Sequence, residues 1–189
     1  MILDIASLLS NNQAITVTAP STGVYDTAGL GVGQPVTNIF GQTFGGATNF
    51  GITQKVYDHY LNGLGDPLND VADISSAEVA AIYKMWYWNP AHADALVSRL
   101  AKVHFDSAVN HGVGRAVKFL QQLVGVTTDG MWGPATIAAV ASADQDALVT
   151  PYLALRRAFY GKIVAADATQ AKFLPQWLKR LEELQAAVA

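Results

Sequence analysis

From Ile52 to the C-terminus, apolar residues recur at spacings of three and four, which is the period of an amphipathic helix. The series begins with Ile52, Val56 and Tyr60, and its last stripe includes Trp177 and Leu181. Glycine and proline interrupt the series at intervals short enough to separate several helices. We therefore expect a mainly α fold built from several helices rather than one long helix.

Three local signals mark helix starts. Ser75 and Glu78 have the spacing of a capping box, in which each side chain accepts a hydrogen bond from the other residue's backbone amide. Thr150 followed by Pro151 predicts a cap and a first helical residue. Pro175 is compatible with the last helix only if it lies in the first turn.

Residues 1–43 differ from the remainder of the chain. Gln13–Ala19 is rich in β-branched residues that alternate between apolar and polar as in a strand, and the segment that follows is rich in glycine and poor in charge. This region holds too little apolar surface for a core of its own. It is either a loop-rich start of the domain or an extended, β-prone arm that adds strands to a partner. We favour the arm.

The composition excludes several kinds of function. A net charge of −3 does not predict nucleic-acid binding. The chain has no cysteine, and its four histidines lack metal-ligand spacing, so we expect no metal and no cofactor. No apolar run reaches the roughly 18–20 residues of a membrane-spanning helix, and Met1–Ile5 lacks the basic start of a signal peptide. We expect synthesis in a reducing cytoplasm and no membrane partner.

Several blocks of sequence resemble glycoside hydrolase family 108, the phage and bacterial muramidases. They are Gly45–Thr53, Ile82–Trp88 and Phe105–Asn110. The run from Leu120 to Thr136, with Asp129-Gly130-Met131-Trp132-Gly133-Pro134, is similar to that family's C-terminal peptidoglycan-binding module. The resemblance covers residues 44–187. It implies a lysozyme-like region over 44–112, a peptidoglycan-binding helical module over 113–189, and peptidoglycan as a partner.

The resemblance also implies a catalytic glutamate shortly before the opening stretch. Counting back from Gly45 by the family's spacing leads to Gln34, and no glutamate precedes Glu78. Cleavage of a glycoside needs a carboxylic acid that donates a proton to the leaving oxygen. Glutamine cannot do so, and Asp26 lies far from the expected register. We therefore name no confident catalytic residue and expect catalysis to be lost.

Other family positions predict substrate contacts. Thr48 matches a threonine that positions water in lysozyme-like sites, or it caps the following turn, and Asn49 lies beside it. Tyr87 and Trp88 are candidates for a cleft wall, whereas Trp86 is expected in the core.

Asp106 and Asn110 share a helix face, and either bind substrate or belong to an ordinary helix end. Trp132 would carry contacts in the C-terminal module. The charges of residues 179–183 predict a solvated helix face.

The first 43 residues resemble phage capsid cement, or decoration, proteins. The similar segments are Met1–Asp4, Gln13–Thr18 and Ser21–Gly33. This resemblance implies a virion location, with the major capsid protein and further copies of the chain as partners. We favour a virion structural protein that displays a non-catalytic, lysozyme-like, peptidoglycan-binding domain. The alternatives are an active muramidase and a free peptidoglycan-binding module.

Overall fold

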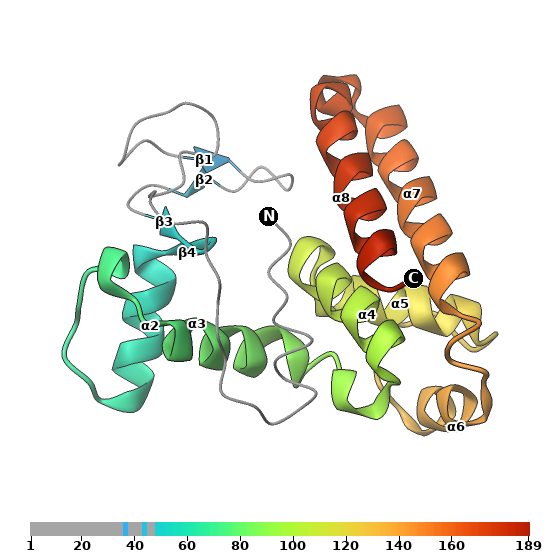
Figure 1. Cartoon of the computed structure of the whole chain (residues 1–189), viewed down its shortest axis with the longest axis horizontal. Coiled ribbons are helices and arrows are strands. Elements are labelled where there is room, and N and C mark those ends of the chain that lie inside the picture. The colour runs from blue at the N-terminus through green and yellow to red at the C-terminus, as the bar shows by residue number, and fades with distance from the viewer. Residues whose placement is uncertain (1–35, 38–42, 45–47) are drawn as a thin grey trace. The chain divides into compact units, whose positions relative to one another are not determined.

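The computed structural model describes residues 36–37, 43–44 and 48–189 (Figure 1). Two compact units divide between Ile82 and Tyr83, and we name them the N-terminal unit and the C-terminal unit. The expected mainly α fold is confirmed, because helices account for most of the described residues. The arm expected over residues 1–43 lies outside the described residues, except for the short pieces that form β1 and begin β2.

The N-terminal unit combines two small hairpins with helices. Its elements are β1 (Val36–Thr37), β2 (Thr43–Phe44), β3 (Thr48–Asn49), β4 (Ile52–Thr53), α2 (Gln54–Leu64), the 3₁₀ turn η1 (Val71–Asp73) and α3 (Ser76–Tyr83). β1 pairs with β2 and β3 with β4, both antiparallel. At the start of α2, the Thr53 hydroxyl accepts a hydrogen bond from the Val56 backbone amide. The helix ends at Gly65, whose φ of 76° is left-handed.

The capping box at the start of α3 is confirmed. The Ser75 amide donates to Oε2 of Glu78 at 2.8 Å, and the Glu78 amide donates to Oγ of Ser75 at 3.3 Å. The chain then continues from α3 into a π-helical segment, η2 (Lys84–Trp88).

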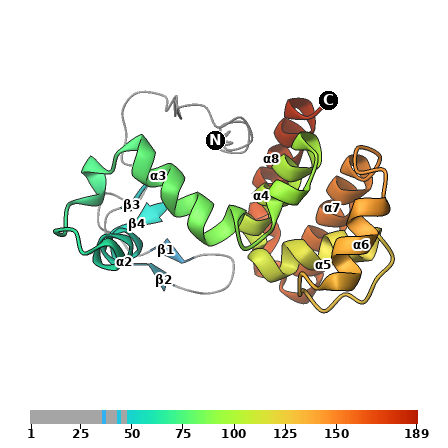
Figure 2. The same ribbon diagram turned by 90° about the horizontal axis from the view of Figure 1, so that it is seen from below.

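In the described part of the C-terminal unit, residues 83–189, all regular structure is helical. After η2 come η3 (Ala93–Ala95), α4 (Ser98–His111), α5 (Val113–Leu123), α6 (Pro134–Ser142), α7 (Val149–Ala166), η4 (Ala168–Phe173) and α8 (Leu174–Ala187). α4 packs against α5 and α7. α7 and α8 run antiparallel side by side (Figure 1), and Figure 2 shows α4 next to α8. Their shared core includes Leu100, Val103, Leu120, Tyr152 and Leu184, all fully buried.

Of two helix starts predicted from proline positions, one is confirmed and one is wrong. Pro175 lies in the first turn of α8, as predicted. Thr150 is not the cap of α7, because the helix already begins at Val149. Backbone hydrogen bonds from Leu148 to Gln145 and from Val149 to Asp146 form the turns that lead into it.

The boundary expected between residues 112 and 113 stays a prediction. By its contacts, α4 belongs to the same compact unit as α5 to α8. Among the helices that the structure describes, none combines the length and the apolar character needed to cross a membrane.

Candidate functional site

Asn49 belongs to a tight hairpin that its own side chain attaches to the next turn. Phe50 and Gly51 join β3 to β4 with φ angles of 51° and 77°, as in a type I′ turn. The Asn49 amide donates to the carbonyl oxygens of Val71 at 3.2 Å and Ala72 at 3.1 Å. Asn49 therefore holds the hairpin against η1. Contact with a substrate stays a prediction.

Gln34 and Thr48 are the two residues nearest to the family's catalytic positions, and the structure describes neither side chain. Gln34 lies outside the described residues. Of Thr48 the structure describes the backbone alone, in register with Thr53 of β4. The predicted water-positioning role of Thr48 therefore remains a prediction.

Glu78 is the first glutamate of the chain and the only one before Glu182. The Tyr57 hydroxyl donates to its Oε1 at 2.7 Å, and the Ser75 amide and hydroxyl donate to its Oε2 at 2.8 and 2.6 Å. Burial alone would raise the pKa of Glu78, but these hydrogen bonds outweigh it and lower the pKa below its usual value. Both oxygens of this carboxylate thus accept hydrogen bonds within the fold, and the group is ionised at neutral pH.

The expected placement of the tryptophans next to Tyr87 is wrong. Trp88 is 1% exposed, and its indole nitrogen donates to Asp94 at 2.7 Å, whereas Trp86 is only half-buried. The cause is the π-helical segment, since an i→i+5 turn contains more residues than an α turn and rotates the following side chains to another face. Trp88 cannot line a cleft. Tyr87, also half-buried, packs on the small core of Ala91, Ala108 and Ala116.

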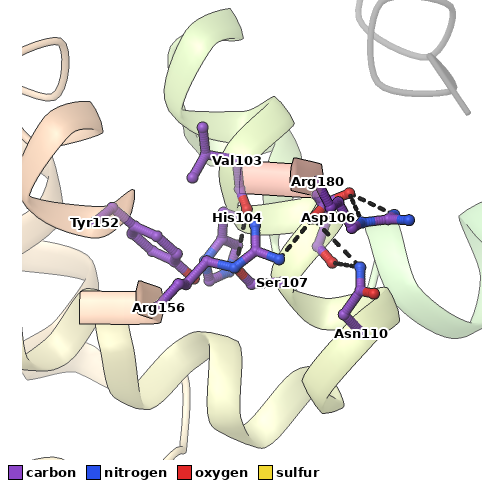
Figure 3. Close-up of polar contacts among 8 residues, drawn as sticks. All are labelled: Val103, His104, Asp106, Ser107, Asn110, Tyr152, Arg156 and Arg180. Carbon is purple, nitrogen blue, oxygen red and sulfur yellow. Dashed lines mark hydrogen bonds and ion pairs between the residues drawn. The ribbon is translucent and has the colours of Figure 1, made fainter. Parts of the chain in front are cut away.

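Asp106 lies at the centre of a buried charge cluster (Figure 3). It is 6% exposed and forms ion pairs with Nη2 of Arg156 at 2.7 Å and Nη2 of Arg180 at 2.6 Å. Asn110 donates to its backbone oxygen at 2.7 Å and to its Oδ2 at 3.3 Å. Burial would raise the pKa of Asp106, but the charges of Arg156 and Arg180 outweigh burial and lower it. Both carboxylate oxygens of Asp106 and the side-chain nitrogen of Asn110 form contacts within the protein, and binding of substrate by either residue stays a prediction.

Two buried groups beside this cluster are incompletely paired. Arg156 is fully buried, and its Nε and Nη1 have no hydrogen-bond partner among the described residues. His111 is 6% exposed, and neither ring nitrogen has a partner in that part of the chain. The rings of Phe119, Phe159 and Tyr160 lie around His111 at 5.2–5.9 Å. Burial, followed by the charge of Arg156, lowers the pKa of His111 to about 3.

Gln121 organises the loop between α5 and α6. This side chain is 1% exposed, and its amide nitrogen donates to Asp129 at 2.7 Å, to the Met131 carbonyl at 2.9 Å and to Thr136 at 3.0 Å. Its amide oxygen accepts from the Gly130 backbone at 2.8 Å. A single buried amide therefore fixes both sides of the loop.

Trp132, which the sequence suggested as an exposed contact residue, is half-buried. Its ring stacks on His92, with centroids 5.0 Å apart and planes inclined by 14°. His92 is exposed and has a φ of 54°. That left-handed conformation costs a residue other than glycine roughly 1–2 kcal/mol.

Comparison with known proteins agrees with this helical architecture. Residues 42–112 match the family model described as glycosyl hydrolase 108, and residues 115–182 match the model described as a predicted peptidoglycan domain. Among solved structures, the chain is similar to that of Brucella abortus SagA, with 28% sequence identity and a TM-score of 0.60. The similarity covers 82% of this chain and 86% of the other. None of the proteins with curated descriptions matches the chain.

By class, the chain is thus a lysozyme-like protein with a peptidoglycan-binding domain. Residues 42–112 match glycosyl hydrolase 108, and the resemblance inferred from residues 44–187 is confirmed. Both matches begin after residue 41, so the resemblance of the first 43 residues to capsid cement proteins stays a prediction.

Sequence reasoning missed several residues that shape these regions. Arg180 was grouped with a solvated helix face, but its guanidinium contacts Asp106. The helical period could have indicated this, because Arg180 lies next to the buried Leu181 and Trp177 precedes it by three residues. No local pattern indicated the roles of Gln121 or His92.

Proposed function

We propose that this protein binds peptidoglycan and does not hydrolyse it. The binding half of the proposal follows from the peptidoglycan-domain match over residues 115–182. The observation that carries the other half is the state of Glu78. It is the only glutamate in residues 42–112, and its carboxylate is ionised and accepts hydrogen bonds from Tyr57 and Ser75.

A glycosidase needs a carboxylic acid whose pKa is high enough to keep a proton at working pH. The pKa values of Glu78 and Asp106 are both lowered, which is the opposite of that requirement. Gln34 stands where the family's glutamate is expected. General acid–base catalysis contributes about 10²–10⁴-fold to rate, so its loss leaves little hydrolysis.

The Gln34→Glu variant tests this reading. We expect it to release reducing ends from purified peptidoglycan at least about a hundredfold faster than the wild type, because it restores a proton donor. Gln42→Glu is the matched control, since it introduces the same group at a nearby glutamine and should remain inert. Hydrolysis by the wild type at a rate comparable with that of Gln34→Glu would support the alternative, an active muramidase.

A finer proposal concerns location. We propose that residues 1–43 attach the chain to a phage capsid, with the major capsid protein and further copies of the chain as partners. The support is the resemblance of this segment to capsid cement proteins. Display of many copies would convert weak individual binding to a cell wall into avidity.

The expected result is that the chain co-purifies with intact virions, and that a variant lacking residues 1–43 does not. Quantitative mass spectrometry of gradient-purified particles measures both. Particles that contain none of the full-length chain would refute the capsid role and leave peptidoglycan binding untouched.

A further inference from the structure

We infer that His92, Trp132 and Met131 form a contact surface for the glycan strand of peptidoglycan. We call these three residues the His92 platform. The inference rests on the proposed function, and it names the residues and the part of the polymer that meet. All three residues belong to the C-terminal unit.

The platform has one supported ring and one outer ring. Trp132 stacks on His92 at 5.0 Å, and the ring of the buried His104 lies 6.3 Å from Trp132. Trp132 thus has two imidazole rings as neighbours, and of these His92 is the exposed one. Met131 precedes Trp132 in the sequence, and its apolar side chain is 69% exposed.

The geometry of the turn does not by itself explain why a histidine occupies position 92. Its φ of 54° is a conformation that glycine adopts without steric cost and that histidine does not favour. A turn requiring only this geometry would be served better by glycine. The histidine ring is thus the feature that needs an explanation, and unusual backbone conformations of this kind concentrate at functional sites.

The loop that carries Trp132 and Met131 is held rigidly although it is at the surface. Gln121 fixes Asp129, Gly130 and Met131 by the hydrogen bonds described above. A Cβ on Gly130 would lie 2.9 Å from the Gly114 backbone oxygen, so the loop is packed directly on α5. A preorganised surface loses little conformational entropy when a ligand binds.

The chemistry of the platform favours a sugar ring over the peptide stems. Flat aromatic rings offer an apolar face that matches the C–H face of a pyranose, and Trp132 and Met131 carry no charge to attract the ionised stem peptides. His92 lies in the segment that matches glycosyl hydrolase 108, whereas Trp132 and Met131 lie in the peptidoglycan-domain segment. The platform therefore combines residues of both matched segments, which neither match indicates on its own.

The test is co-sedimentation of the full chain with purified sacculi at increasing sacculus concentration. We expect His92→Gly and Met131→Ala each to weaken binding about tenfold, while His92→Phe stays within about threefold because it keeps a ring. Met85→Ala is the matched control, since Met85 is 47% exposed in the same unit and lies outside the platform. A soluble tetramer of N-acetylglucosamine should compete with sacculi for the wild type.

The outcomes separate this inference from the proposed function. If the wild type binds sacculi and both His92→Gly and Met131→Ala bind equally well, the inference is overturned and the proposed function stands. Loss of binding in both variants without competition by the sugar tetramer also overturns it, because the contact is then with the peptide stems. No sedimentation of the wild type overturns both. The melting temperature of each variant shows whether weaker binding reflects unfolding, and weaker binding that tracks unfolding counts against the platform.

Discussion

Asp106→Asn is expected to destabilise the C-terminal unit by about 3–5 kcal/mol, the usual cost of removing one partner from a buried ion pair. Asp106 is the carboxylate that faces Arg156 and Arg180 in the buried cluster (Figure 3). Arg156 is fully buried, and its Nε and Nη1 already lack partners among the described residues. Without the Asp106 charge, this guanidinium would be a buried cation with no counter-charge in that cluster.

Urea unfolding followed by tryptophan fluorescence measures this effect selectively. All four tryptophans lie in the C-terminal unit, so the signal reports that unit alone. Asp146→Asn is the matched control, because it removes the same charge from the Arg99–Asp146 pair, whose side chains are 48% and 56% exposed. Exposed pairs contribute about 0–1 kcal/mol. A similar small change in both variants would contradict the account of the cluster.

The C-terminal unit is also expected to lose stability as pH falls below about 6.5. The pKa of His104 is lowered to about 4 and that of His111 to about 3, in both cases chiefly by burial. Below the ordinary histidine pKa near 6.5, the unfolded chain binds protons that the folded protein excludes, so acid favours unfolding. The loss accumulates down to the folded pKa of each residue. Between pH 6.5 and 4, each histidine contributes about 3 kcal/mol.

His111→Phe separates the two contributions. His104 makes hydrogen bonds with Tyr152 and Ala91, at 3.0 Å each, whereas the ring nitrogens of His111 have no partner among the described residues. A phenyl ring removes a buried polar group, so we expect a gain of about 1–3 kcal/mol at pH 7. We also expect a clearly flatter decline towards pH 4.

Urea midpoints at pH 7, 6, 5 and 4 measure both effects. His59→Phe, at an exposed histidine of the N-terminal unit, is the control and should leave the pH dependence of tryptophan fluorescence unchanged. A decline as steep in His111→Phe as in the wild type would show that His111 is not the source of the acid sensitivity.

Local signals predicted much of the helical architecture. The apolar period and its glycine and proline interruptions indicated a series of helices after Ile52, of which α2 is the first and α8 the last. The Ser75–Glu78 capping box was predictable because both of its partners lie within one helical turn. Sequence resemblance identified the family, because its motifs occur in their expected order.

The remaining features depend on contacts between distant segments or on backbone geometry. Arg180 and Asp106 are 74 residues apart, and the helical position of Arg180 alone does not name its partner. The π-helical turn before Trp88 changes which tryptophan faces the core, and an α-helical period cannot represent it. The left-handed conformation of His92 has no sequence signal, because that position is usually recognised by glycine or asparagine.

The most direct test of the central claim is to incubate the wild-type chain with purified sacculi and to measure bound protein and released reducing ends in the same sample. The account predicts that the chain sediments with the sacculi and that reducing ends stay at the level of the protein-free blank. Reducing ends that increase with time would contradict the loss of catalysis. A chain that remains in the supernatant would contradict peptidoglycan binding itself.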